Sequence, residues 1–252
     1  MRTYLCLLPN TLCTISLSLP KTENMFGLPT HLQNIDDVEL KQIMQQAVML
    51  QNGMVASTMA KAGVRGVMNY GVSQTDLRGL ARQYGVNHSL ARRLCQLQIR
   101  EAKILASLLF DANNFTDSDL QLLFDSVVNL DLAINLAHNI IWKIADIGFY
   151  SRLAEAGKWH AVAAFYAVGE SVARRSDHSE KLSDWFVENL EPIAVKGSVE
   201  LLQSAVSTMQ TIAGISVERQ KTISDIAKKL QHSSSMLAQN IGNQFLMLDS
   251  DS

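Results

Sequence analysis

Proline and glycine are scarce in this sequence of 252 residues. Its four prolines and 13 glycines are too few for a many-stranded sandwich or for a Pro/Gly-rich low-complexity chain. Three prolines lie within the first 29 residues and the fourth is Pro192, so no proline interrupts helix formation between Thr30 and Glu191. These absences favour an all-α fold.

Cysteine, long apolar runs and several enzyme motifs are also missing. Cys6, Cys13 and Cys95 are too few for a disulfide framework and do not pair with histidine at zinc-ligand spacing. No apolar run approaches the roughly 18 residues that cross a bilayer. A nucleophile elbow, a P-loop, a Rossmann fingerprint and an H-E-x-x-H motif are all absent. We therefore expect a cytoplasmic protein with no membrane partner, no metal and no cofactor.

The start of the chain differs from the rest. Its apolar run at residues 4–8 has a faint likeness to a signal peptide, but Pro9 ends the run and no cleavage site follows. We expect residues 1–34 to be a disordered tail or an over-extended start, with Met25 as the alternative initiator. Residues 35–252 are expected to form a single helical domain.

Helical periodicity dominates after residue 34, and cap residues mark where helices begin. The candidate caps are Asp36 or Asp37, Ser73 with Asp76 three residues later, Asn87 and Thr116. The pattern predicts about a dozen helices joined by short loops, including segments at 99–110, 130–143 and 158–174 and a short helix that ends before Pro192. Helices of this length and spacing are typical of stacked antiparallel helix pairs in a HEAT-like α-solenoid, with repeats of roughly 35–45 residues.

The net charge of −2 hides a basic segment. Residues 61–110 carry eight Lys or Arg against two acidic residues, a net +6, whereas residues 111–252 carry a net −7. In a solenoid, neighbouring helices would gather six of these cations into one patch that binds nucleic-acid phosphates: Arg78, Arg82, Arg92, Arg93, Arg100 and Lys103. The alternative is an ordinary solvated face.

A polar stripe lies on the predicted helix at 130–143. Asp131, Asn135, His138 and Trp142 project within an arc of about 60° on a helix that is otherwise apolar. Such a stripe suits a groove wall. Alternatively, Asp131 caps the helix, His138 makes one structural hydrogen bond and Trp142 belongs to the core.

Two runs carry a resemblance to a known family. Asn69-Tyr70-Gly71-Val72-Ser73 and the later run from Arg100-Glu101-Ala102-Lys103 to Leu109 resemble the AlkD-type DNA alkylation repair family. The resemblance covers residues 54–144 well and extends weakly to 174. It implies HEAT-like helix pairs, a basic concave groove for duplex DNA and, in active members, removal of alkylated purines.

The same resemblance implies a damaged catalytic site. The family's carboxylate comes from a W-D-x-x-D motif at a helix start, where a negative charge stabilises an oxocarbenium-like sugar. The matching stretch here has Leu130 in place of Trp and Ile134 in place of the second Asp, so only Asp131 matches. A groove-facing Arg of the family maps onto Val162.

We therefore expect a monomer that binds duplex DNA and has reduced or no DNA glycosylase activity. Two alternatives remain open. One is an active alkylpurine glycosylase that uses Asp131. The other is a helical scaffold whose acidic C-terminal part contacts a basic protein partner.

Overall fold

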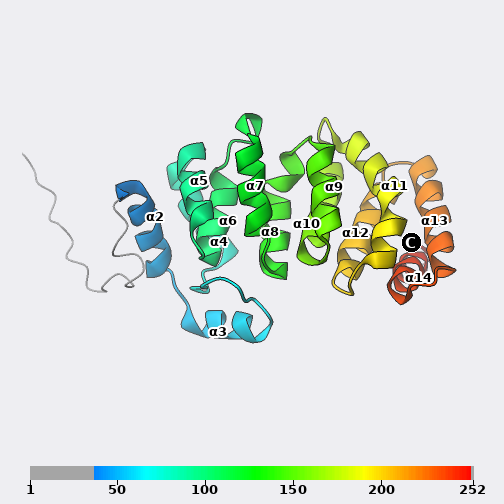
Figure 1. Ribbon diagram of the computed structural model, residues 1–252, viewed down its shortest axis with the longest axis horizontal. Helices are drawn as coiled ribbons and strands as arrows, with labels where there is room; N and C mark the ends of the chain where they lie inside the picture. The colour runs from blue at the N-terminus through cyan, green and yellow to red at the C-terminus, as the bar shows by residue number, and fades with distance from the viewer. Residues whose placement is uncertain (1–36, 251–252) are drawn as a thin grey trace, which may run out of the picture. The chain divides into compact units, whose positions relative to one another are not determined.

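The computed structural model describes residues 37–250 of the chain. The described residues form thirteen α-helices and two short 3-10 helices, and they contain no strand (Figure 1). The prediction of an all-α fold is confirmed. The expected tail, the alternative start at Met25 and the candidate cap Asp36 lie outside the described residues.

The helices are 9 to 18 residues long and short connections join most of them. Their bounds are α2 (Val38–Met49), α3 (Gly53–Lys61), α4 (Gln74–Tyr84), α5 (His88–Gln96), α6 (Arg100–Leu109), α7 (Asp117–Ser126), α8 (Leu130–Asn139), α9 (Ile147–Ala156), α10 (Lys158–Ala173), α11 (Ser179–Lys196), α12 (Leu201–Ala213), α13 (Val217–Gln231) and α14 (Met236–Ser250). The 3-10 helices are η1 (Ala112–Asn114) and η2 (Ile141–Lys143).

Side-chain caps fix the starts of the helices where the sequence predicted them. The carboxylate of Asp37 accepts the backbone N–H of Leu40 at the start of α2. Ser73 and Asn87 cap α4 and α5 in the same way, and Thr116 forms a capping box at the start of α7. These caps satisfy N–H groups that a helix leaves without intrahelical partners.

The even-numbered helices from α4 onward form what we call the inner row. In this row α4 packs on α6, α6 on α8, α8 on α10, α10 on α12 and α12 on α14. Odd-numbered helices pack beside them, as in the pairs α5–α6, α9–α10 and α13–α14. Figure 1 shows this stacking of helix pairs along the described part of the chain. The arrangement is the one expected of a HEAT-like array.

The inner row has two different edges. Residues that follow the C-terminal ends of α4, α6, α8 and α10 line one cleft of about 980 Å³, so these ends lie along a common C-terminal edge. At the opposite, N-terminal edge, the loop before α4 and the starts of α6 and α8 are joined by hydrogen bonds and an ion pair. Helix α3 lies at this N-terminal edge, outside the row (Figure 1).

Two helix boundaries differ from the prediction. The helix expected at 130–143 ends at Asn139, because Ile140 leaves the helical conformation and η2 follows. The short helix expected before Pro192 is instead one helix, α11, that continues through the proline. Buried Leu190 and Ala194 on either side of Pro192 supply packing that offsets the lost hydrogen bond. Within residues 37–250, no helix is long and apolar enough to cross a membrane.

Candidate nucleic-acid interface

The two motifs that carry the family resemblance contact each other. The carboxylate of Glu101 on α6 accepts the backbone N–H groups of Tyr70 (3.1 Å) and Val72 (3.3 Å) in the loop before α4. Between them, Gly71 has φ +71°, and a Cβ atom there would lie 2.3 Å from the carbonyl oxygen of Asn52. Only glycine fits this close approach. The two motifs therefore fix the start of α4 against α6.

Arg100 lies inside this junction. Its side chain is 3% exposed, its Nη1 donates to Glu101 Oε1 (3.1 Å) and to the carbonyl of Val72 (3.2 Å), and its Nε donates to Asp131 Oδ2 (2.7 Å). Burial opposes the charge, but the bonds to Asp131 and Glu101 hold the pKa of Arg100 above its ordinary value. The prediction that Arg100 contacts DNA is corrected: it joins α4, α6 and α8.

Lys103 is also internal. The residue is 2% exposed, and its Nζ donates to the carbonyl of Cys95 at the end of α5 (2.9 Å) and to Ser126 Oγ at the end of α7 (3.4 Å). Burial lowers the pKa of this ammonium group. Its predicted role in the DNA patch is corrected as well, because the charge is enclosed by protein.

The two arginines of α5 are engaged by acidic neighbours. Arg92 Nε lies 3.2 Å from Asp119 Oδ1, and Arg93 bonds the carboxylates of Asp37 and Glu39. Both arginines remain partly exposed, yet carboxylates beside them offset their positive charge. They are not part of a patch of free cations.

Arg78 and Arg82 differ from the other four predicted cations in their surroundings. Both side chains are exposed, and within residues 37–250 neither has an ionic or hydrogen-bonding partner. They follow Gln74 at intervals of four residues, so all three lie along one side of α4. The Gln74 amide bonds the side chain of Asn135 on α8. The two arginines therefore lie on the side of α4 that carries Gln74. We call the surface formed by this side of α4 and by the Asp131–His138 side of α8 the open side of the inner row.

Three of the four stripe residues share one side of α8. Asn135 is 6% exposed and donates to the carbonyl of Asp131 (2.7 Å), while His138 Nδ1 lies 2.8 Å from Glu170 Oε2 on α10. Trp142 has left the helix for η2 at the C-terminal edge, where the guanidinium of Arg174 lies 4.9 Å from its ring centre. The structure thus separates Trp142 from the rest.

Glu170 is a polar residue of this surface that the sequence did not reveal. It accepts from both His138 and Arg174, and these bonds hold the pKa of Glu170 below its ordinary value although partial burial opposes them. The spacing of four residues between Glu170 and Arg174 in the sequence could have predicted their ion pair. Its pairing with His138, 32 residues away, depends on how α8 and α10 pack.

The positions that match the family's catalytic residues are mostly apolar. Leu130 is 39% exposed and Ile134 is half-buried, whereas Val162 is fully buried in α10. Asp131 is 19% exposed and is bound by Arg100 through two hydrogen bonds. The carboxylate that remains near this position is therefore already neutralised by a cation.

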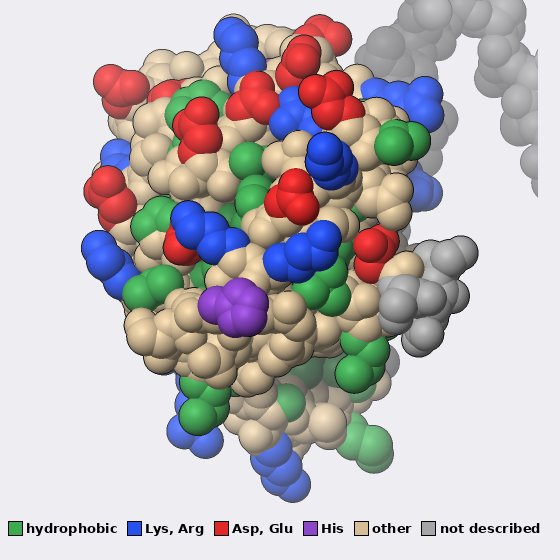
Figure 2. Space-filling model, turned by 90° about the vertical axis from the view of Figure 1, so that its right-hand side faces the viewer, with side chains coloured by type: hydrophobic (Ala, Val, Ile, Leu, Met, Phe, Trp, Pro, Cys, Tyr) green, Lys and Arg blue, Asp and Glu red, His purple; other side chains and the backbone are tan. Residues whose placement is uncertain are grey.

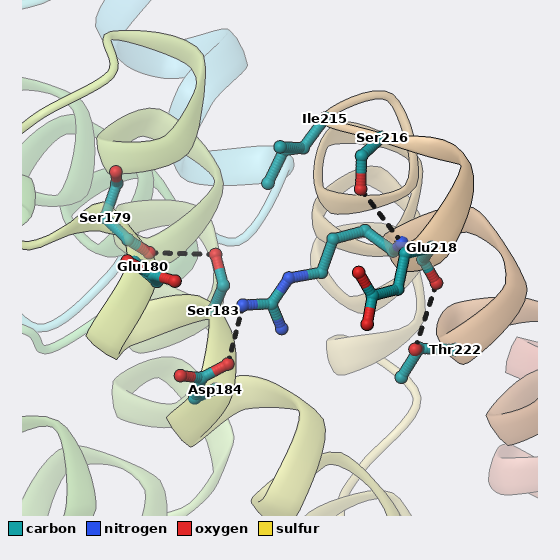
Figure 3. A pocket seen from close by; sticks show the side chains of 9 residues that line it. Ser179, Glu180, Ser183, Asp184, Ile215, Ser216, Glu218 and Thr222 are labelled. Atoms are coloured by element: carbon teal, nitrogen blue, oxygen red, sulfur yellow. Dashed lines mark hydrogen bonds and ion pairs between the residues drawn. The ribbon is translucent and has the colours of Figure 1, made fainter.

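The C-terminal helices carry a separate polar cleft. It has a volume of about 630 Å³, lies between α11 and α13, and contains an ion pair between Arg219 and Asp184 (2.7 Å) together with Glu180 and Glu218 (Figure 3). On the face at this end of the described residues, acidic and basic side chains lie interspersed (Figure 2). Within residues 37–250, no group of three or more His, Cys, Asp or Glu side chains could hold a metal ion.

Comparisons with known proteins agree with this geometry. The model of the DNA alkylation repair enzyme family matches residues 30–191. A solved structure described as a new family of proteins related to the HEAT-like repeat DNA glycosylases with affinity for branched DNA structures has a TM-score of 0.64 at 16% identity. The match covers 83% of this chain and 94% of that chain. No curated protein matches the sequence. The HEAT-like fold is confirmed.

Proposed function

The chain belongs to the DNA alkylation repair enzyme family, and on that premise we propose that it binds DNA on the open side of the inner row without efficient base excision. The binding is expected to depend on backbone charge and to show little sequence preference, because the candidate contacts are arginines on a helix surface.

The free pair Arg78 and Arg82 carries this proposal. Their Cβ atoms are about 6 Å apart along α4. Successive phosphates of one DNA strand are separated by about 3.4 Å of axial rise, so this distance is a little less than two such steps. Two guanidinium groups so placed can reach phosphates of the same strand. Since neither has a protein partner among residues 37–250, DNA binding would not require an existing ion pair to break.

The form of DNA is part of the proposal. The related solved protein has affinity for branched DNA structures. We extend this property to the present chain and expect it to bind both a plain duplex and a four-way junction. Comparing the two probes under the same salt conditions measures any preference for the branch.

A salt titration of DNA binding tests the role of the α4 arginines. The variant R78A/R82A should bind a labelled duplex about tenfold or more weakly, and the slope of log affinity against log salt should fall by about two, roughly 0.9 for each lost phosphate contact. The control K181A/K221A removes two exposed lysines from α11 and α13 and should bind like wild type. Absence of wild-type binding at about 50 mM salt would refute the proposal.

The second part of the proposal is that the protein does not excise alkylated bases efficiently. A glycosylase needs a negative charge that stabilises the sugar cation of the transition state. Ile134 supplies none, and the charge of Asp131 is held by Arg100 at 2.7 Å.

We expect wild type to release no 3- or 7-methylpurine from methylated DNA above background, and Asp131→Asn to leave that background unchanged. Release by wild type that falls sharply in Asp131→Asn would instead establish the glycosylase alternative.

A further inference from the structure

A segment at the N-terminal edge buries none of its residues in the core. We call residues 53–69, which comprise α3 and the loop after it, the arm. None of the residues of α3 is buried, and Met54 is 82% exposed. Short helices are stable in proteins mainly because they pack an apolar face. The arm therefore needs another source of order.

Hydrogen bonds at both ends of the arm supply that order. Before α3, the backbone N–H of Asn52 donates to the carbonyl of Tyr70 (2.8 Å). After it, the backbone N–H of Met68 donates to the carbonyl of Gln98 (2.9 Å), and its carbonyl accepts the N–H of Arg100 (2.8 Å), the first residue of α6. The arm is thus held against the inner row by the backbone rather than by side-chain packing.

Asn129 places Arg65 beside α8. Its Oδ1 caps α8 by accepting the N–H of Leu132, while its Nδ2 donates to the carbonyl of Arg65 (2.9 Å). One side-chain amide therefore joins the start of α8 to the loop that follows α3 in the arm. The backbone of Arg65 is consequently held at the edge of the inner row where α8 begins.

The arm is positively charged. From Leu40 to Thr75 the sequence has no acidic residue. The side chains of Lys61 and Arg65 are exposed, and neither has an ionic or hydrogen-bonding partner in the part of the chain that the structure describes. The acidic residues at this edge are Asp76, Glu101 and Asp131 in the first turns of α4, α6 and α8, and Arg100 bonds the last two.

The C-terminal edge is more acidic than the arm. Its cleft is lined by four aspartates against two cations: Asp111, Asp117, Asp146, Asp177, Lys143 and Arg174. A polyanion on the open side of the inner row would therefore be favoured at the arm, which has two cations and no acidic residue, over the C-terminal edge.

From this asymmetry we infer that the arm is a second DNA contact, in which Lys61 and Arg65 bind backbone phosphates at the N-terminal edge. The inference rests on the proposed function, since it takes DNA to lie on the open side of the inner row. Because hydrogen bonds already hold the backbone of the arm at this edge, binding would cost little further ordering of that backbone.

The test compares K61A/R65A with K181A/K221A in the full-length chain, using the same labelled duplex over a range of salt concentrations. Both variants remove two exposed cations, so they change the net charge equally. We expect K61A/R65A to weaken binding and to lower the salt slope by about two, roughly 0.9 for each phosphate contact. The control should retain the wild-type affinity and slope.

The outcomes separate this inference from the proposed function. If wild type binds DNA and K61A/R65A matches the control, the inference is refuted and the proposed function stands. If wild type does not bind, both fall. If K61A/R65A keeps full DNA affinity but changes the sedimentation of the protein, a second copy covers the arm and the inference is also refuted.

Discussion

Helices α4 and α6 each carry two cations from the same basic stretch of sequence, and they use them in opposite ways. Arg78 and Arg82 of α4 are exposed and have no partner within residues 37–250. Arg100 and Lys103 of α6 are at most 3% exposed, and their side chains donate hydrogen bonds to other groups of the protein. Charge in a sequence therefore identifies a basic segment, but neighbouring helices decide which charges reach a ligand.

The difference follows from where the two helices stand. α6 packs against α4, α5 and α8, and Arg100 to Ser107 are all buried. A cation in that position must be paired or hydrogen-bonded, because desolvation of an unpaired charge is costly. α4 packs against α6 and α2, which leaves one side of the helix open to solvent.

The largest expected effect is on stability and falls on α6. Arg100→Ala leaves Glu101 and Asp131 without their cation, so the free energy of unfolding should drop by about 3–5 kcal/mol. Arg78→Ala, its counterpart on α4, should change the value by no more than about 0.5 kcal/mol. Urea unfolding followed by circular dichroism measures both. Equal losses in the two variants would contradict the distinction between internal and external cations.

Lys103→Met should have a smaller and pH-dependent effect. Near neutral pH the loss is about 1–3 kcal/mol, because the buried carbonyl of Cys95 loses its donor. Burial lowers the pKa of Lys103 below 10.5, so between its folded pKa and 10.5 the unfolded chain binds more protons. Wild-type stability should therefore rise relative to Lys103→Met as pH increases through that interval.

Urea unfolding of both proteins at several pH values measures the difference, in which the titration of groups distant from Lys103 cancels. Lys181→Met, at an exposed position on α11, is the control and should follow wild type throughout. A wild-type advantage over Lys103→Met that shrinks as pH rises would contradict the assignment.

Local signals in the sequence were enough for most of the fold. Caps such as Ser73 and Thr116 act within three residues, so the sequence reveals them without tertiary information. The proline in α11 misled the prediction because a helix can continue through Pro192 when packing on both sides compensates. The early end of α8 was also missed, because Ile140, where the helix ends, is fully buried and its conformation depends on tertiary packing.

The candidate site was less accessible to sequence reasoning. Arg100 and Arg78 have the same side chain, yet the partner of Arg100 is Asp131, 31 residues away. The same holds for His138 and Glu170. Such pairings depend on which helices stack, and periodicity within one helix contains no information about them.

The smallest expected effect tests whether α4 is open to solvent beside Arg78. A Cβ atom on Gly79, next to Arg78, has no heavy atom within 4 Å. Gly79→Ala should therefore raise the free energy of unfolding by about 0.5–1 kcal/mol through helix propensity, and DNA affinity should stay unchanged. Gly71→Ala is the matched contrast, since its Cβ would lie 2.3 Å from the Asn52 carbonyl oxygen at φ +71°. That variant should be destabilised, and a gain in stability there would show that the loop before α4 is not held as described.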